Sequence, residues 1–379
     1  MPRIDWRELY AQNQTAIADA GIRLPGMTLA SPPETLSPRP RQTSHRHSPA
    51  TPGGPGALAD PCRHPPGLRS APRRRPAAAD RVLVHLPPGL NRSMPAAVVF
   101  MLHGCTQDPS SFATATAMNQ TADRHGFVVV YPGQPRGRNA QGCWNWFLPE
   151  HQQRGAGEPE LIAGIARRLI ASESGQLIDP TRIFIAGLSS GGAMALILAA
   201  CYPDVFSAVA IHSGLPYRSA ADVASAFAVM RGAGAKRAPD GRAIHAAMGE
   251  RARPMPSLVI HGTADATVAP DNARQILAQS MHANHLAAPL VCAHDPAKPS
   301  ASRCARAAGG LAYTHNRWAG PNGAPMHESL EIQDLGHAWS GGVPGGSHTD
   351  SRGPSATEAI WAFFAQADGS LRSRRDEHT

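Results

Sequence analysis

The sequence predicts an α/β domain built around a mostly parallel β-sheet. From about residue 81, short runs rich in Val and Ile alternate with stretches of helical periodicity. Strands that are covered on both faces show such continuous apolar runs, and strands that alternate with helices favour a parallel sheet. The chain of 379 residues, 42% of them hydrophobic, is long enough to build this core. The predicted strands span residues 96–104, 126–132, 182–187, 206–214 and 257–262.

Helical segments separate these strands and end the domain. Residues 158–174 place apolar side chains at helical spacing. The final stretch, SATEAIWAFFAQA (355–367), begins with Ser355, a residue type that caps helix N-termini well. We therefore expect one globular domain over residues 81–367, followed by a flexible tail at 368–379.

The N-terminal part has a different composition. Thirteen of the 36 prolines lie between Pro25 and Pro76, and residues 31–80 hold eight arginines against three acidic residues. Such a segment buries too little apolar surface to offset the entropy of ordering it. Residues 1–80 are therefore predicted to be a largely disordered, Pro/Arg-rich segment. It is either a plain solvated spacer or a polymer- or surface-binding arm.

Composition also excludes several classes of protein. Most of the formal charge of +8 lies in the Pro/Arg-rich segment, so no nucleic-acid partner is expected for the domain. No run of about 18 apolar residues occurs, so no membrane span is expected. None of the six cysteines has a CxxC spacing, so no zinc site is expected. No metal and no cofactor are predicted for the domain.

A candidate nucleophile lies in the stretch IFIAGLSSGGAMALILAA, where a predicted strand turns directly into a predicted helix. A sharp turn of this kind needs small residues two positions before and after its central residue, as in the motif G-x-S-x-G. Gly187 and Gly191 flank Ser189 in this way, whereas Leu188 would stand at the first position for Ser190. The spacing therefore selects Ser189 as the nucleophile.

A serine nucleophile needs a histidine base and a carboxylate that orients it. In this type of site the chain order is Ser, then Asp or Glu, then His. Asp265, in HGTADATV, and His337, in DLGHAWSGG, each follow a strand-like run in that order. A histidine base accepts a proton only when neutral, so activity is expected to rise with pH as the imidazole loses its proton. The alternative acids are Asp334 and Asp271, and the alternative bases are His261 and His348.

The oxyanion of the tetrahedral intermediate needs two backbone donors. One is the N–H of Ser190 at the start of the helix after the nucleophile. The other is expected in the loop after an earlier strand, near LHGCTQ, where Gly104 allows a close approach of the backbone and the N–H of Cys105 becomes the donor.

A group of motifs resembles the poly(3-hydroxybutyrate) depolymerase family of esterases, over roughly residues 81–367. This resemblance implies an α/β-hydrolase fold and cleavage of carboxylic esters, with Ser189, Asp265 and His337 as the catalytic residues. It also implies Cys105 and Ser190 as the oxyanion donors. The motifs that carry the resemblance are LHGCTQ (102–107), CWNWF (143–147), AGLSSGGAM (186–194), HSGLPY (212–217), HGTADATV (261–268), GHAWSGG (336–342) and SHTDSRGP (347–354).

The resemblance also implies a substrate site and a substrate. Trp144, Asn145, Trp146 and Trp339 are expected to form its walls, since clustered aromatic side chains suit an apolar acyl or polymer chain; the alternative is packing in the core. The expected substrate is a polyhydroxyalkanoate or its oligomers, and the insoluble polyester is one form of it. The alternative enzyme is a feruloyl or acetylxylan esterase, and the alternative outside enzymes is a catalytically silent polymer-surface binding protein, against which the intact Ser, Asp and His argue.

Whether the cysteines form disulfides depends on the compartment of the protein, because disulfides persist in oxidising surroundings. Cys105 and Cys143 lie in two of the motifs and are candidates for a disulfide, the alternative being two buried free thiols. The resemblance implies an extracellular or periplasmic protein, but the N-terminus lacks the basic start and apolar centre of a secretory signal, which makes the cytoplasm the alternative. Cys292 and Cys304 are a second candidate pair, and Cys62 and Cys201 are expected to be free.

Overall fold

A computed structural model gives the arrangement of the domain. The predicted disordered segment 1–80, the predicted tail 368–379 and Cys62 lie outside the residues that it describes. The described residues are 82–135, 137–233, 240–290 and 292–367.

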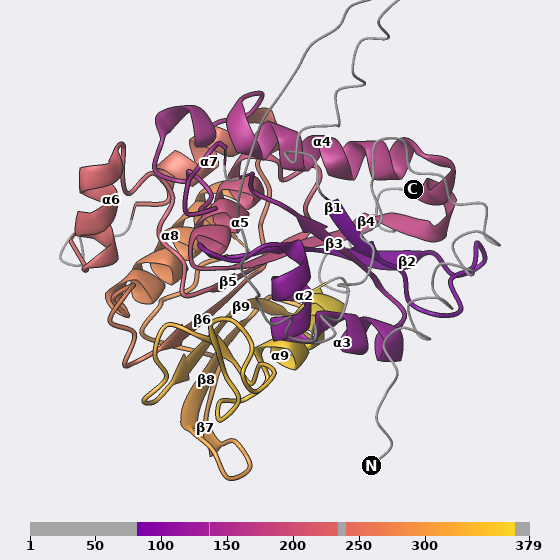
Figure 1. Cartoon of the computed structure of the whole chain (residues 1–379). Coiled ribbons are helices and arrows are strands. Elements are labelled where there is room, and N and C mark those ends of the chain that lie inside the picture. Colours follow the sequence, from indigo (N-terminus) through magenta and orange to yellow (C-terminus); the bar gives the residue numbers. More distant parts are fainter. Residues whose placement is uncertain (1–81, 136, 234–239, 291, 368–379) are drawn as a thin grey trace, which may run out of the picture. The chain divides into compact units, whose positions relative to one another are not determined.

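Within the described residues, the chain forms a nine-stranded sheet in the order β1-β3-β2-β4-β5-β6-β9-β8-β7 (Figure 1). The strands from β3 to β9 in this order pair in parallel, while β1 at one edge and β8 and β7 at the other are antiparallel to their neighbours. The strands are β1 (Val82–His85), β2 (Ala96–Leu102), β3 (Val128–Pro132), β4 (Ile178–Leu188), β5 (Ala208–His212), β6 (Ser257–Gly262), β7 (Ala301–Arg306), β8 (Ala312–Ala319) and β9 (Pro325–Ile332). A separate parallel pair joins β10 (Trp339–Ser340) to β11 (Thr349–Asp350).

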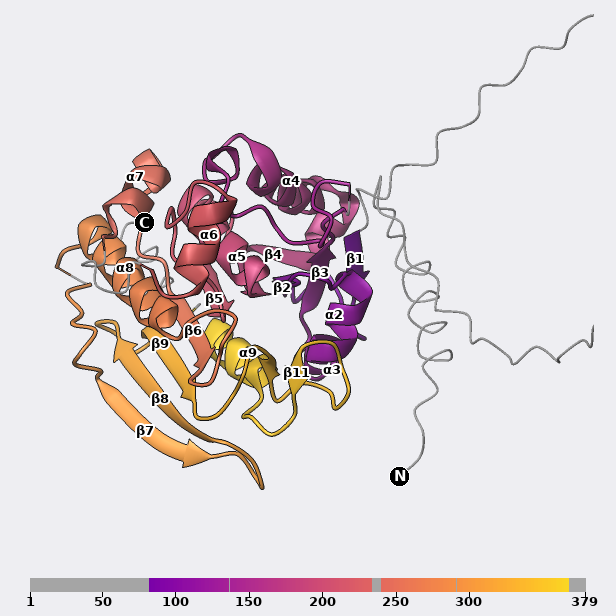
Figure 2. The ribbon, with the colours of Figure 1, turned by 60° about the vertical axis from the view of Figure 1, so that its left-hand side comes forward.

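Helices cover both faces of the sheet, as Figure 2 shows. The prediction of a mostly parallel sheet flanked by helices is confirmed. One layer contains α4 (Gly157–Ala171), α5 (Ser190–Cys201), α6 (Val223–Met230), α7 (Arg242–Met248) and α8 (Asp271–Ala287), and the other contains α2 (Pro109–Thr116), α3 (Met118–His125) and α9 (Ala356–Ala367). Short 3-10 turns lie at Pro149–His151, Glu173–Leu177 and Gly249–Arg251.

The continuous apolar runs arise because each central strand faces two cores. On β4, Ile183 and Ile185 pack into the core under α4 and α5. Phe184 and Ala186, which point the other way, pack into the core under α9. The Phe184 ring stacks on Phe364 of α9 at 4.7 Å between centroids. Alternate residues of a strand point to opposite faces, so both sets must be apolar.

Several features differ from the sequence prediction, among them β1, which is not one of the predicted strands. Strand β4 begins at Ile178, four residues before the predicted start, because Ile178 pairs with Ala96, the first residue of β2. The antiparallel hairpin of β7 and β8 was not predicted, since β7 is an exposed edge strand of mainly polar residues. No helix of the described residues is both long and apolar enough to cross a membrane.

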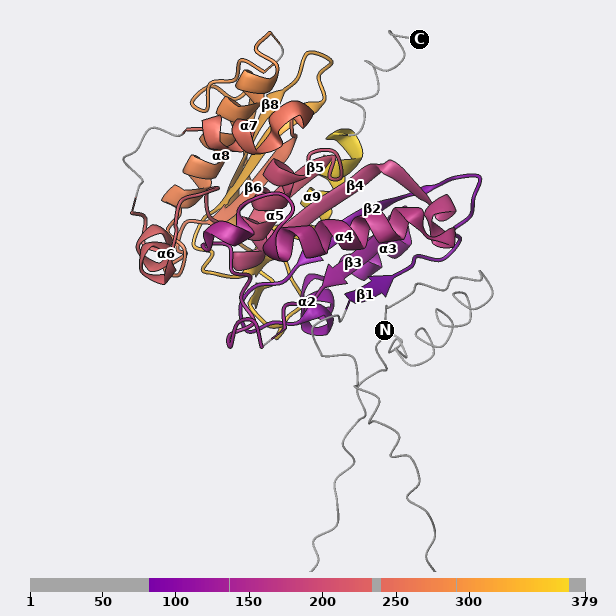
Figure 3. The same cartoon turned by 90° about the horizontal axis from the view of Figure 1, so that it is seen from above.

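The parallel strands end side by side at one edge of the sheet. The register pairs Leu188 with His212 and Gly262 with Ile332, so the loops after β4, β5, β6 and β9 emerge together. Figure 3 shows β4, β5 and β6 as neighbours in the sheet. The residues that the sequence selects as nucleophile, acid and base all follow these strand ends. In sheets of this kind ligands bind beyond the carboxyl ends of the strands.

Candidate active site

Ser189 lies in the sharp turn between β4 and α5. Its backbone has φ 58° and ψ −119°, a conformation that L-residues rarely adopt and that is found at functional turns. Its N–H donates to the His212 carbonyl at 2.9 Å, which ties the turn to the neighbouring strand β5. The Ser189 residue keeps 8% of its surface accessible in a region that is otherwise buried.

The two glycines that flank Ser189 are required by close backbone approach. A Cβ at Gly187 would lie 2.3 Å from the Gly191 carbonyl, and one at Gly191 would lie 2.2 Å from the Leu102 carbonyl oxygen. Real Cβ atoms do not approach so closely, so a larger residue would force the strand and helix apart. The small-residue spacing on which Ser189 was selected therefore has a direct steric cause.

Asp265 and His337 come together from neighbouring strands. Asp265 follows β6 and His337 follows β9, and Nδ1 of His337 lies 2.7 Å from Oδ2 of Asp265. The other carboxylate oxygen, Oδ1, accepts from the backbone N–H groups of Thr267 and Val268 at 3.0 and 2.8 Å. The Asp265 side chain is fully buried, whereas the His337 side chain keeps 15% of its surface exposed. This is the arrangement expected of a carboxylate that orients a histidine.

The carboxyl group of Asp265 is held in its charged form. Burial raises the pKa of Asp265, but hydrogen bonds from His261 and His337, the charge of His337 and the Val268 N–H lower it more, so the pKa lies below its ordinary value. An ionised carboxylate is acceptor-only, so it fixes the proton of His337 on Nδ1. The other ring nitrogen of His337, Nε2, is then free to accept a proton.

The alternative acids and bases occupy other places. Asp271 pairs with Arg274 in the first turn of α8, and Asp334 is exposed, with its N–H bonded to Thr263 Oγ1 at 3.0 Å. His261 is buried; its Nε2 donates to the Val268 carbonyl at 2.9 Å and lies 3.4 Å from Asp265 Oδ2. His348 is exposed and bonds Thr106 Oγ1 at 3.0 Å.

The loop after β2 packs directly against the nucleophile turn. A Cβ at Gly104 would lie 3.6 Å from the Ser189 Cβ and 3.5 Å from the Leu188 carbonyl oxygen. The structure thus brings the backbone of Gly104, the residue before Cys105, next to Ser189. Ser190 Oγ lies 3.6 Å from the Cys105 sulfur.

A disulfide joins this loop to the loop after β3. Cys105 and Cys143 are bonded, with a Cα–Cα distance of 4.2 Å, which confirms the predicted bridge. Cys201 is a buried free thiol, as predicted. The predicted bridge between Cys292 and Cys304 is wrong, because Cys304 is an exposed free thiol on β7 while Cys292 is buried.

The residues expected to wall the substrate site are buried. Trp339 is inaccessible to solvent, with its ring stacked on His212 at 5.1 Å and its Nε1 bonded to Thr357 at 3.1 Å. Trp144, Asn145 and Trp146 keep 3 to 7% of their surface accessible. Trp144 Nε1 donates to the carbonyl of His103 at 3.0 Å. This burial is what the alternative of packing in the core predicts.

Sequence reasoning missed His212, which ends β5 and bonds the chain just after His337. Its Nε2 accepts from the Ser340 N–H at 3.1 Å, which fixes the strand that follows His337. Burial, with smaller effects from His261 and His337, lowers the pKa of His212 to about 3, so the ring is neutral. A histidine inside an apolar strand gives no sequence signal that separates this role from ordinary packing.

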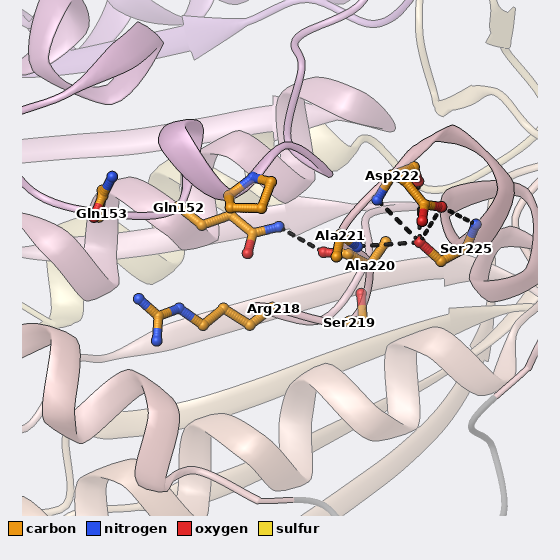
Figure 4. Close-up of a pocket in the computed structure, with 9 residues that line it drawn as sticks. Gln152, Gln153, Arg218, Ser219, Ala220, Ala221, Asp222 and Ser225 are labelled. Carbon is orange, nitrogen blue, oxygen red and sulfur yellow. Dashed lines mark hydrogen bonds between the residues drawn. The ribbon is translucent and has the colours of Figure 1, made fainter.

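A surface pocket lies between the turn at 149–153 and the loop after β5 (Figure 4). Figure 4 shows the Arg218 side chain extending away from Asp222, whose carboxylate accepts from the Ser225 N–H at 2.7 Å. None of the three predicted catalytic residues lines this pocket. It is therefore separate from the site at Ser189.

Comparison with known proteins places the chain among esterases. A family model described as Esterase PHB depolymerase matches residues 81–292. Poly(3-hydroxyalkanoate) depolymerase C of Paucimonas lemoignei is 34% identical over 262 residues, which cover 67% of this chain and 57% of that protein. Feruloyl esterase B of Neurospora crassa is 37% identical over 131 residues, which cover 34% of this chain and 43% of that protein. The chain thus spans about half the length of the curated relatives it matches.

A solved structure supports the fold. The acetyl xylan esterase from Aspergillus awamori aligns with a TM-score of 0.58 at 18% identity, over 75% of this chain and 93% of that one. At this identity the likeness concerns the fold alone. Together with the strand order and the turn at Ser189, it confirms the α/β-hydrolase fold that the motifs implied. Because the family model matches more than half of its residues, the chain belongs to the Esterase PHB depolymerase family.

Proposed function

We propose that the protein is a serine esterase that hydrolyses carboxylic esters through Ser189, Asp265 and His337. The observation that carries the proposal is the 2.7 Å contact between His337 and Asp265, at the same edge of the sheet as the strained turn of Ser189. A histidine that acts as a general base requires a buried, ionised carboxylate that holds it by Nδ1. On a loop, such a pair contributes little to holding the fold together.

The reaction follows from these groups. His337 Nε2 takes the proton of Ser189 Oγ as that oxygen attacks the ester carbonyl, and Asp265 stabilises the imidazolium. The tetrahedral intermediate expels the alcohol, which receives the proton from His337, and an acyl-enzyme ester remains on Ser189. Water, deprotonated by His337, attacks this ester, and the carboxylic acid leaves as Ser189 regains its proton.

The negative charge of both intermediates is assigned to the N–H groups of Cys105 and Ser190. Gly104, which precedes Cys105, packs against Ser189, and Ser190 lies at the N-terminus of α5. In the part of the chain that the structure describes, neither N–H has a protein hydrogen-bond acceptor. Donors that are fixed in place and unused in the resting site suit a charge that forms only during the reaction.

We further propose polyhydroxyalkanoate, or its oligomers, as the substrate. The support is the similarity to the Paucimonas lemoignei protein, whose name refers to poly(3-hydroxyalkanoate). The names of other similar proteins refer to feruloyl and acetylxylan esterases, which makes these esters the second candidate class. The disulfide between Cys105 and Cys143 favours an oxidising compartment, and we propose an extracellular or periplasmic location for the domain at 81–367.

A side-by-side assay tests the substrate class. Purified protein is supplied with p-nitrophenyl butyrate, a feruloyl ester, an acetylated xylan and emulsified poly(3-hydroxybutyrate). The proposal predicts hydrolysis of the butyrate ester, with release of soluble acids from the polyester and a lower kcat/KM on the feruloyl and acetyl esters. Hydrolysis of the feruloyl or acetyl ester alone would support the second class, and no hydrolysis of any of the four would contradict the esterase assignment.

A further inference from the structure

A buried carboxylate outside the proposed triad lies at the start of α4. Glu158 is 1% exposed, and no Arg or Lys pairs with it within the described ranges. His151 lies nearby, with Nδ1 at 3.9 Å from Oε2. That nitrogen accepts the Glu158 N–H at 2.8 Å, so it carries no proton to give to the carboxylate. A buried charge without an ion pair must be held by hydrogen bonds.

Those hydrogen bonds come from the two ends of one loop. The Asn145 N–H donates to Oε2 at 2.8 Å, and the Asn145 side chain donates to Oε1 at 2.7 Å. The Gln134 amide also donates to Oε1, and the position of Glu158 in the first turn of α4 favours a negative charge. Glu158 therefore connects Gln134, which follows the end of β3, with Asn145 in the CWNWF motif.

The loop between Gln134 and Asn145 is in turn attached to the loop after β2, which contains Cys105. The Gln134 amide donates to the Cys143 carbonyl at 3.0 Å, and Cys143 is bonded to Cys105. The Gln134 N–H donates to Nε2 of His103 at 3.1 Å. The Thr106 N–H donates to the Gln141 carbonyl at 2.7 Å. Residues on both sides of Cys105, and Cys105 itself, are thus attached to the loop that Glu158 closes.

We propose that Glu158 is a positioning residue that fixes the N–H of Cys105 for the oxyanion. The inference rests on the proposed function. Glu158 is well suited to the task because a carboxylate accepts hydrogen bonds on both oxygens, and three N–H donors converge on them. In Glu158→Gln the side chain keeps its shape, but an NH₂ group replaces one of the two oxygens. That NH₂ group faces an N–H donor, so at least one of the three hydrogen bonds is lost. A displacement of about 1 Å at a catalytic group lowers the rate by about 100-fold.

The test compares Glu158→Gln with Glu160→Gln. Glu160 lies on the same helix, pairs with Arg167 on the surface and accepts from the Tyr202 hydroxyl, so it is a matched control. Each variant is assayed on p-nitrophenyl butyrate, its active sites are counted with a fluorophosphonate, and its Ki is measured for a boronic acid that forms a tetrahedral adduct with the serine. We expect Glu158→Gln to lower kcat per active site by about 10- to 100-fold, with KM within about twofold. Its Ki should rise by a similar factor, and Glu160→Gln should stay near the wild type.

The outcomes decide whether Glu158 has the proposed positioning role. Wild-type kcat and Ki per active site in Glu158→Gln, or a loss explained wholly by fewer active sites, would overturn the positioning role. If Glu158→Gln does not fold, Gln134→Ala replaces it, because it removes the bonds to Glu158 and to the Cys143 carbonyl but leaves the carboxylate. The same pattern of lower kcat and higher Ki is then required, and its absence overturns the inference. A wild-type protein without esterase activity would contradict the proposed function itself, whereas an active wild type with an unaffected variant contradicts the inference alone.

Discussion

Nδ1 of His337 and Oδ2 of Asp265 are 2.7 Å apart, although 72 residues separate them in the chain. Parallel pairing of β6 with β9 brings them together, because each residue lies in the loop after one of these strands. The contact selects the tautomer of His337, and in the proposed reaction Asp265 would stabilise the imidazolium. The proposed roles of both residues depend on this contact.

Replacing Asp265 with Asn should remove the charge and permit the wrong tautomer of His337. We expect kcat to fall by about 10³- to 10⁴-fold, while the backbone N–H of Val268 still has an amide oxygen to bond. Circular dichroism checks the fold, and Asp271→Asn on the surface of α8 serves as the control. A loss of less than tenfold in Asp265→Asn would mean that another acid orients the histidine.

The disulfide between Cys105 and Cys143 should support both stability and rate. It closes a loop with a sequence separation of 38, for which the chain-entropy model gives about 4 kcal/mol of the free energy of unfolding. We expect the double variant Cys105→Ser, Cys143→Ser to have a lower Tm and a lower kcat with KM little changed. Cys304→Ser, at the exposed free thiol, controls for loss of a cysteine as such. Unchanged kcat in the double variant would show that the oxyanion loop is held without the bridge.

Gly191 should tolerate no side chain. The Cβ of Gly191→Ala would lie 2.2 Å from the Leu102 carbonyl oxygen, so β2 or α5 would have to move away from Ser189. We expect loss of activity with a lowered Tm. Gly137→Ala, where no atom lies within 4 Å of the added Cβ, should match the wild type in both. Full activity in Gly191→Ala would rule out the close packing of the turn.

Two buried histidines should make the fold sensitive to acid. Burial, assisted by nearby histidines, lowers the pKa of both His212 and His327 to about 3 in the folded protein, whereas an unfolded histidine has a pKa near 6.5. Between about pH 6.5 and pH 3 the unfolded state binds these protons and the folded state does not. The free energy of unfolding therefore falls as pH falls, by up to about 1.4 kcal/mol per pH unit for each histidine.

Urea denaturation at pH 7, 6, 5 and 4 measures this slope. His327 bonds Ser257 and Asn284 in the core and takes no part in the proposed reaction. In the variant His327→Gln the side chain at this position does not titrate. Between pH 6 and pH 4 its free energy of unfolding should therefore fall less steeply than that of the wild type, by the contribution of about one proton. An identical slope in wild type and variant would show that His327 is protonated in the folded state.

The sequence predicts the central strands well because strong local signals mark them, and the same signals select Asp265 and His337, which the structure brings into contact. Buried parallel strands are continuous apolar runs, and Asp265 and His337 each follow such a run. The hairpin of β7 and β8 was missed because the exposed residues of β7 follow no apolar alternation. The roles of Glu158 and His212 depend on partners distant in the chain, which no local pattern reveals. Trp339 illustrates the same limit, since an aromatic beside a catalytic loop can pack below it as well as line it.

The choice between Ser189 and Ser190 as the nucleophile can be measured by mapping the residue that reacts covalently. The protein is treated with a fluorophosphonate and digested, and the peptide that contains both serines is fragmented in a mass spectrometer. We expect one adduct, on Ser189, with full labelling in Ser190→Ala and none in Ser189→Ala. An adduct on Ser190, or labelling that persists in Ser189→Ala, would contradict the assignment of Ser189 as the nucleophile.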